Sequence, residues 1–153
     1  MADPIVIAGA ARTPMGGFQG ELGGATASDL GGVAIKAALE RGGIDPGSVG
    51  ELLMGNVLTA GQGQAPARQA GFAAGLAKDV PATTLNKMCG SGMKAVMIAH
   101  DQLAAEGSGV VVAGGMESMT NAPYLLPKMR GGARLGHAEV KDHMFLDGLE
   151  DAY

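Results

Sequence analysis

The fold of this chain is decided by residues 82–115, which read ATTLNKMCGSGMKAVMIAHDQLAAEGSGVVVAGG. Residues 82–86 are typical of a short strand. Residues 92–105 keep helical spacing of apolar side chains and are apolar on the other faces too, which predicts a helix enclosed between layers. Residues 109–115 form a continuous apolar run of the kind found where both faces of a sheet are covered. A strand, a helix and a strand in this order predict a mainly parallel α/β sheet.

The residues before this stretch continue the alternation of strands and helices. The β-branched run at residues 4–9 predicts a buried strand. Ser28 is expected to cap a helix that ends at Gly42. A strand within 49–57 and a helix over 66–77 follow. The apolar face predicted for the first of these helices consists of Leu30, Val33, Ala34, Ala37 and Ala38.

Composition limits the classes to which the protein can belong. The chain has 153 residues, of which 46% are hydrophobic, so it can form a core and is not disordered. Eleven basic against 15 acidic residues give a net charge of −4, which disfavours nucleic acid and membrane surfaces as partners. No targeting signal or membrane span is recognisable, and the single cysteine fits a reducing compartment, so we expect a cytoplasmic protein.

Glycine is unusually abundant, with 27 of the 153 residues. Because glycine has no Cβ, this abundance in a chain with a real core predicts backbones that pack closely against one another or against a ligand.

Cys89 lies between the strand at 82–86 and the helix at 92–105, so it sits at or just before a helix N-terminus. Free amide N–H groups and the helix dipole stabilise a thiolate there, and the Cys89 N–H is placed to donate to an oxyanion on an acyl group. Gly90 and Gly92 permit a tight turn and leave room for a substrate. The alternative is that Cys89 is a small buried hydrophobic residue.

A second alternative is a dinucleotide-binding unit. Gly90, Gly92 and Ala95 match the pattern G-x-G-x-x-A between a strand and a helix, and Glu117 follows the next strand. Against this reading, residues 87–89 separate the first glycine from the strand that it should follow directly.

The chain also resembles the thiolase family along nearly its whole length. Residues 85–96 (LNKMCGSGMKAV) are similar to the acyl-cysteine signature of that family. The C-G-S-G form followed by Met93 and Lys94 is more like biosynthetic acetoacetyl-CoA thiolases than fatty-acid-degrading ones. Other blocks that resemble the family, in the same order, are residues 11–18, 55–58, 61–69, 112–119 and 147–153.

The resemblance implies a function for Cys89. It would accept an acetyl group from acetyl-CoA, and a second acetyl-CoA would attack this thioester to give acetoacetyl-CoA and CoA, reversibly. Acetyl-CoA and acetoacetyl-CoA are thus the implied ligands, with no metal or redox cofactor. Leu149 matches a position that lines the pantetheine path. The alternatives are a degradative 3-ketoacyl-CoA thiolase or a non-catalytic subunit that keeps only half of the fold.

The resemblance also implies a fold and a missing partner. We expect one half of a duplicated thiolase-type mixed sheet layered with helices over residues 1–120, and the start of a loop or cap excursion with tetramer contacts over 121–153. The G-H-P, C-x-G-G-G and N-E-A-F motifs of the family's second half do not occur here. The remaining C-terminal half is therefore an expected partner, in a homotetramer, and this chain by itself is expected to be inactive.

Two groups of charged side chains receive no catalytic role. Mid-helix His100 is expected to be a satisfied structural residue, and His137 and His143 in the tail do not have the spacing of a helical metal pair. A solvated or tetramer-contact face is preferred over a phosphate site for the basic residues of the tail, which are Lys128, Arg130, Arg134 and Lys141.

Overall fold

A three-stranded parallel sheet lies at the centre of the computed structural model, which describes residues 4–106 and 109–153. The order is β2 (Ala82–Leu85), β1 (Glu51–Gly55), β3 (Val111–Gly115). In the middle strand, Leu52 pairs with Ala82 on one side and with Val112 on the other. The mainly parallel α/β architecture predicted from the sequence is confirmed.

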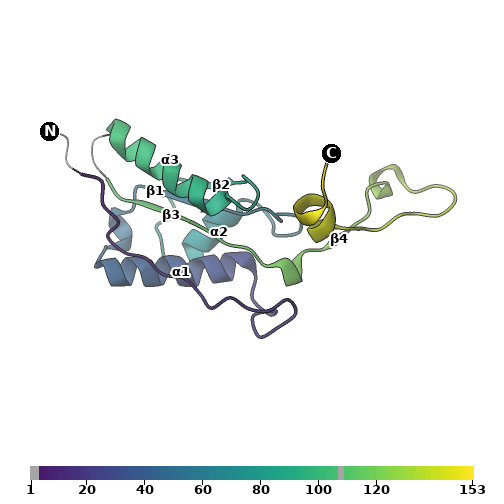
Figure 1. Cartoon of the computed structure of the whole chain (residues 1–153), viewed down its shortest axis with the longest axis horizontal. Helices are drawn as coiled ribbons and strands as arrows, with labels where there is room; N and C mark the ends of the chain where they lie inside the picture. Colours follow the sequence, from purple (N-terminus) through teal and green to yellow (C-terminus); the bar gives the residue numbers. More distant parts are fainter. Residues whose placement is uncertain (1–3, 107–108) are drawn as a thin grey trace.

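Helices cover both faces of this sheet (Figure 1). One face carries α3 (Ser91–Glu106), under which Leu53 packs with Ala95 and Ala99. The other carries α2 (Pro66–Ala73), and α1 (Ala27–Gly42) packs on α2. The larger part of the core lies on this second side and includes Leu52 and Met54.

The predicted elements of the sheet are found close to their predicted bounds. β1 lies inside 49–57, and β2, α3 and β3 begin and end within two residues of the prediction. Pro66 begins α2, as predicted, and the Ala67 N–H donates to the Thr84 hydroxyl of β2 at 3.0 Å. The helix ends at Ala73 and not at residue 77, because the chain turns at Gly75 with φ of +87°.

The strand predicted at residues 4–9 is wrong. Ile5, Val6 and Ile7 belong to no sheet and are 40%, 72% and 83% exposed. The segment instead runs along α1, where a Cβ on Gly9 would lie 2.2 Å from the Ala38 carbonyl oxygen. A β-branched run favours extended backbone, but a strand also needs a neighbour to pair with, and the described part of the chain supplies none here.

The first helix begins earlier than predicted and buries a different face. Thr26 is the N-cap, and Ser28 lies inside the first turn with its hydroxyl donating to the Pro66 carbonyl. Val33, predicted to be buried, is 62% exposed. The buried face is made by Ala27, Ser28, Gly31, Gly32, Ile35 and Leu39.

Close packing through glycine explains this difference. A Cβ on Gly32 would lie 2.6 Å from the Ala73 Cβ, and one on Gly31 would lie 2.6 Å from the Met116 Sδ. The two glycines therefore let α1 approach α2 and the end of β3, so they form the contact face although neither has a side chain. The prediction that glycine serves close backbone packing is confirmed here.

The N-terminus of α1 is closed by a capping box, and a substitution can test how much this motif contributes to stability. The Asp29 carboxylate accepts from the Thr26 hydroxyl at 2.7 Å and from the Thr26 N–H at 3.0 Å, which lowers the pKa of Asp29 from 3.8. We expect Thr26→Ala to cost about 1 kcal/mol of unfolding free energy at neutral pH. A lowered carboxyl pKa contributes stability above the unfolded value that is lost as pH falls, so the cost should shrink below pH 3.8.

Urea unfolding of the wild type and of Thr26→Ala, at neutral pH and at a pH below 3.8, measures this cost in unfolding free energy. The exposed Thr59, whose hydroxyl has no partner in the described residues, provides the control variant Thr59→Ala. Equal costs for the two threonines, or a Thr26 cost that is the same at both pH values, would contradict the expectation.

The enclosure predicted for α3 is not found within the described residues, whereas β3 is packed on both faces. Met93, Val96 and Met97 on the outer side of α3 are 74%, 47% and 51% exposed. Strand β3 is only half-buried because it is an edge strand, although Val111 packs toward α3 and Val112 packs toward the larger core. The outer side of α3 is apolar, as the sequence indicates, but the described residues form no second layer that covers it.

The tail is mostly loop, as predicted, with short elements inside it. It extends away from the sheet and helices (Figure 1). Strands β4 (Tyr124–Leu125) and β5 (Lys141–Asp142) pair antiparallel, and a π-helical turn, η4 (Phe145–Leu149), follows. Short 3₁₀ turns occupy Met119–Asn121 and Met129–Gly131, and another lies outside the tail, between α1 and β1, at Pro46–Ser48. In the described ranges no helix is long and apolar enough to span a membrane.

Candidate active site

The turn between β2 and α3 holds Cys89 in a tight elbow. Met88, just before the cysteine, has φ of +49°, a left-handed conformation that is costly for a residue with a long side chain. The turn is held by two polar neighbours. The Asn86 Oδ1 accepts from the Met88 N–H at 2.9 Å, and the buried Ser91 hydroxyl donates to the Met88 carbonyl at 2.6 Å.

The predicted position of Cys89 at a strand-to-helix turn is confirmed, but the reason for the turn differs from the prediction. The positive φ belongs to Met88, and neither Gly90 nor Gly92 has one. Cys89 itself is exposed, so it is not a buried hydrophobic residue. Its backbone N–H has no acceptor among the described residues.

A glycine in the sheet lets the elbow sit directly on the strands. A Cβ on Gly55, at the end of β1, would lie 2.6 Å from the Ser91 carbonyl carbon, a backbone atom that cannot move aside cheaply. Any side chain at residue 55 would therefore push the start of α3 and the elbow away from the sheet. The close approach of backbones predicted from the glycine content occurs here at the candidate site.

Cys89 opens onto a cavity of about 420 Å³. This is within the size range of small-molecule sites. Leu149, the second predicted site residue, lines the same cavity from η4, although it is 56% exposed. The structure thus brings the two predicted site residues to one place. The other lining residues are Gly55, Val57, Leu58, Met88, Ser91, Gly92, Gly115, Met116, Glu117, Met119, Met144 and Gly148.

Glu117 binds the loop that follows β1. Its carboxylate accepts from the Asn56 side-chain amide at 2.6 Å and from the N–H groups of Val57 at 2.8 Å and Leu58 at 3.0 Å. The carboxylate is therefore occupied by protein donors and is not free for a ribose, which contradicts the dinucleotide alternative. Sequence reasoning missed this role, because Asn56 and Glu117 are 61 positions apart.

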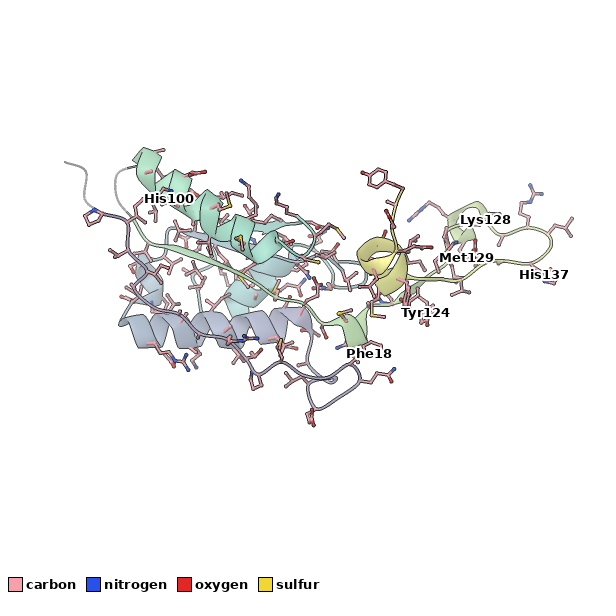
Figure 2. The ribbon with its side chains drawn as sticks, viewed as in Figure 1. Phe18, His100, Tyr124, Lys128, Met129 and His137 are labelled. Atoms are coloured by element: carbon pink, nitrogen blue, oxygen red, sulfur yellow. The ribbon has the colours of Figure 1, made fainter. Side chains whose placement is uncertain are left out.

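None of the three histidines lines the cavity. His100 has a hydrogen-bond partner, the Oδ1 of the neighbouring Asp101 at 3.3 Å, but its side chain is 64% exposed and takes no part in the core. His137 is exposed in the distant loop of the tail, and Figure 2 shows both residues far from η4. His143 is 5% exposed and is hydrogen-bonded to Asp147 and to the Ala60 N–H, which sequence reasoning did not anticipate.

The basic residues of the tail are exposed or paired with a carboxylate. Lys128, Arg130 and Arg134 are exposed. The Glu139 carboxylate, 2.6 Å from the Lys141 Nζ, raises the pKa of that lysine. Among residues 4–106 and 109–153, no three His, Cys, Asp or Glu side chains gather as a metal site would require.

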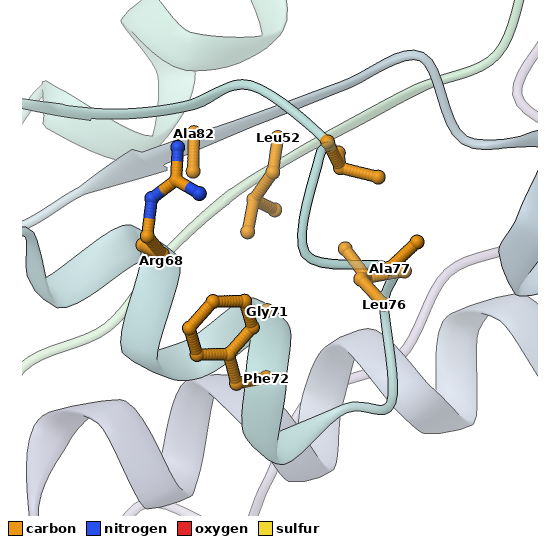
Figure 3. Close-up of a pocket in the computed structure, with 8 residues that line it drawn as sticks. Leu52, Arg68, Gly71, Phe72, Leu76, Ala77 and Ala82 are labelled. Atoms are coloured by element: carbon orange, nitrogen blue, oxygen red, sulfur yellow. The ribbon is translucent and has the colours of Figure 1, made fainter.

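A second hollow between α2 and the sheet is too small for a ligand. Figure 3 shows Phe72 and Arg68 on α2 facing Leu52 of β1 across it. It holds about 10 Å³, roughly the space of one water molecule. The Arg68 guanidinium lies 6.0 Å from the centre of the Phe72 ring and donates to the Lys78 carbonyl, so this arginine is a structural residue.

Comparison with known proteins extends these observations. Residues 5–153 match the family described as "Thiolase, N-terminal domain". The chain is 54% identical to the acetyl-CoA acetyltransferase of Cupriavidus necator, over 97% of this chain and 38% of that protein. It is 52% identical to acetyl-CoA acetyltransferase 1 of Arabidopsis thaliana, of which it covers 36%, and 54% identical to the mitochondrial acetyl-CoA acetyltransferase B of Xenopus laevis, of which it covers 35%. The chain therefore spans little more than a third of the length of these relatives.

Proposed function

The chain belongs to the thiolase family, and from this premise we propose that it supplies the nucleophile of an acetyl-CoA acetyltransferase, with Cys89 as the residue that carries the acyl group. The observation that carries the proposal is the exposure of Cys89 at a tight elbow that faces a cavity of about 420 Å³. The similar proteins of Cupriavidus necator and Arabidopsis thaliana, both named acetyl-CoA acetyltransferases, support acetyl-CoA as the substrate.

The first step is transfer of the acetyl group to sulfur. The Cys89 thiolate attacks the thioester carbonyl carbon of acetyl-CoA, and the carbonyl oxygen takes up negative charge as the new C–S bond forms. The free Cys89 N–H is suited to donate to this oxyanion. The bond to the CoA sulfur then breaks and CoA leaves as a thiolate, with acetyl-Cys89 remaining.

The second step joins two carbon atoms. A base removes a methyl proton from a second acetyl-CoA, and the resulting carbanion attacks acetyl-Cys89. Acetoacetyl-CoA is released and the cysteine thiolate is restored. The acyl group moves between sulfur and carbon without change in the oxidation state of the sulfur, so the reaction needs no redox cofactor. We propose that no metal takes part either.

We propose that the base comes from the C-terminal half of the protein. None of the histidines of this chain lines the cavity, and the relatives are much longer than this chain. The exposed apolar side of α3, at Met93 and Met97, offers a surface for that half to cover. The unpaired extended segment at residues 4–9 supports the same arrangement, because a strand from elsewhere can pair with it.

We further propose a homotetramer in the cytoplasm. The tail supports the oligomer, because it extends from the sheet (Figure 2). Its side chains Leu135 and Met129 are 98% and 52% exposed. The single free thiol supports a reducing compartment. The Xenopus laevis relative is named as mitochondrial, so cell fractionation is the measurement that decides the compartment.

Capture of the acyl-enzyme tests the proposal. The intact protein is incubated with acetyl-CoA, quenched in acid, digested and analysed by mass spectrometry. We expect one acetyl group on the peptide that contains Cys89, and its loss when CoA is added before the quench. An acetyl group on another residue would reject the assignment.

Two other functions remain as outcomes of the same assay. Efficient thiolysis of long 3-oxoacyl-CoA with little acetyl-CoA condensation would identify a degradative 3-ketoacyl-CoA thiolase. Absence of any acetyl-enzyme in the intact protein would identify a non-catalytic subunit that keeps only half of the fold.

A further inference from the structure

His143 is a buried, hydrogen-bonded histidine that the proposed reaction does not use. Its side chain is 6% exposed, and its backbone N–H donates to the Pro123 carbonyl at 3.2 Å. The Nδ1 lies 2.5 Å from the Asp147 Oδ2, and the Nε2 accepts from the Ala60 N–H at 3.3 Å. Because Nε2 accepts, the ring proton is on Nδ1 and is donated to Asp147. Both ring nitrogens therefore have partners, so His143 is fully engaged.

These partners belong to two segments that each contribute residues to the lining of the Cys89 cavity. Ala60 belongs to the loop at residues 57–60, which lines the cavity with Val57 and Leu58. Asp147 belongs to η4, which lines it with Gly148 and Leu149. A single imidazole thus joins two segments that are far apart in the sequence, since His143 and Ala60 are separated by 83 positions.

One of the two walls is fixed independently of His143. Glu117 accepts from the N–H groups of Val57 and Leu58, and the Gln62 side chain donates to the Leu58 carbonyl at 2.7 Å. The other wall rests on the first, because a Cβ on Gly148 would lie 3.2 Å from the Leu58 Cδ2. The hydrogen bond from the Ala60 N–H to His143 joins the tail to this wall as well.

We propose that His143 is a positioning residue that holds η4 against the 57–60 loop and so sets the width of the cavity in front of Cys89. The cavity residues on the two sides of this link are apolar, namely Leu58, Met144 and Leu149. They suit the apolar part of an acyl thioester near the carbonyl. The effect on substrate choice rests on the proposed function, whereas the effect on access to Cys89 does not.

Kinetics of the intact protein test this role. We expect His143→Ala to raise KM for acetoacetyl-CoA in thiolysis about fivefold with kcat within about twofold, because a displaced wall weakens binding of substrate and transition state alike. The preference for acetoacetyl-CoA over 3-oxohexanoyl-CoA should fall about threefold, because a wider cavity discriminates less against added methylenes. A purely structural defect would lower the amount of active enzyme and leave KM and this ratio unchanged.

Two polar variants separate the two bonds of the imidazole. His143→Gln places a carbonyl near the former Nε2 and can still accept from the Ala60 N–H, so it should restore most of the wild-type KM. His143→Asn reaches only the former Nδ1 position and should resemble His143→Ala. His137→Ala, which removes an exposed histidine of the same tail, is the matched control. Equal behaviour of the Gln and Asn variants, or no change in KM for His143→Ala, would overturn the proposal.

A chemical readout distinguishes failure of this proposal from failure of the proposed function. The rates at which iodoacetamide and a bulky maleimide label Cys89 are compared in the intact protein. We expect His143→Ala to raise the maleimide-to-iodoacetamide ratio about threefold, whether or not the protein transfers acyl groups. An acetyl-enzyme that forms normally with an unchanged ratio rejects the positioning role alone. A changed ratio in a protein that forms no acetyl-enzyme rejects only the proposed function.

Discussion

Replacing Cys89 by alanine is expected to lower acetyl-CoA condensation by the intact protein at least about 10⁴-fold, because loss of a covalent nucleophile removes the intermediate and not only a contact. The elbow should persist in this variant. It is held by Asn86 and by the Ser91 hydroxyl, neither of which bonds to the thiol. Circular dichroism and the thermal midpoint should therefore match the wild type while the acetyl-enzyme is absent.

Cys89→Ser and a remote serine variant complete the test. The hydroxyl of Cys89→Ser has the right position but is a far weaker nucleophile near neutral pH, so its turnover should stay close to that of the alanine variant. Ser48→Ala removes a hydroxyl in the 3₁₀ turn Pro46–Ser48, which is not part of the cavity, and should leave turnover unchanged. Condensation by Cys89→Ala at more than a tenth of the wild-type rate would reject the assignment of Cys89 as the nucleophile.

Glu117→Ala is expected to reduce the unfolding free energy of the intact protein by about 3 kcal/mol or more, because it leaves several donors at the cavity without an acceptor. The carboxylate holds the Asn56 amide and the N–H groups of Val57 and Leu58. Asn56 is 1% exposed, so water cannot easily replace the lost partner. The loop at residues 57–60 should loosen as well, and labelling of Cys89 by the bulky maleimide should become faster.

Glu117→Gln refines this expectation, since the amide keeps one acceptor oxygen but turns an NH₂ donor toward N–H groups. Its cost should lie between zero and that of the alanine variant. Glu21→Ala, at an exposed carboxylate without a partner in the described residues, is the control and should change stability by less than about 0.5 kcal/mol. Urea unfolding measures all three variants. A Glu117→Ala protein as stable as the control would show that the carboxylate does not bind the loop as described.

The reliable sequence predictions are those that depend on neighbours in the chain. Spacing of apolar residues located β1, β2, α3 and β3, and the position of Cys89 between a strand and a helix followed from the same reading. Predictions that needed a distant partner were less successful. The run at residues 4–9 was read as a strand although nothing in the described chain pairs with it, and the buried face of α1 was misplaced because Gly31 and Gly32 were not counted as contact residues.

The sequence by itself determined the α/β order, the membership of the thiolase family and the place of Cys89, because local periodicity and short motifs carry that information. Only the tertiary structure decided how the site is held. The Glu117 carboxylate bound across 60 residues and the His143 link across 83 residues both arise from contacts between distant segments. Such contacts depend on how the whole chain packs. The type of a side chain determines which hydrogen bonds it can make, but the tertiary fold determines which partner lies within reach.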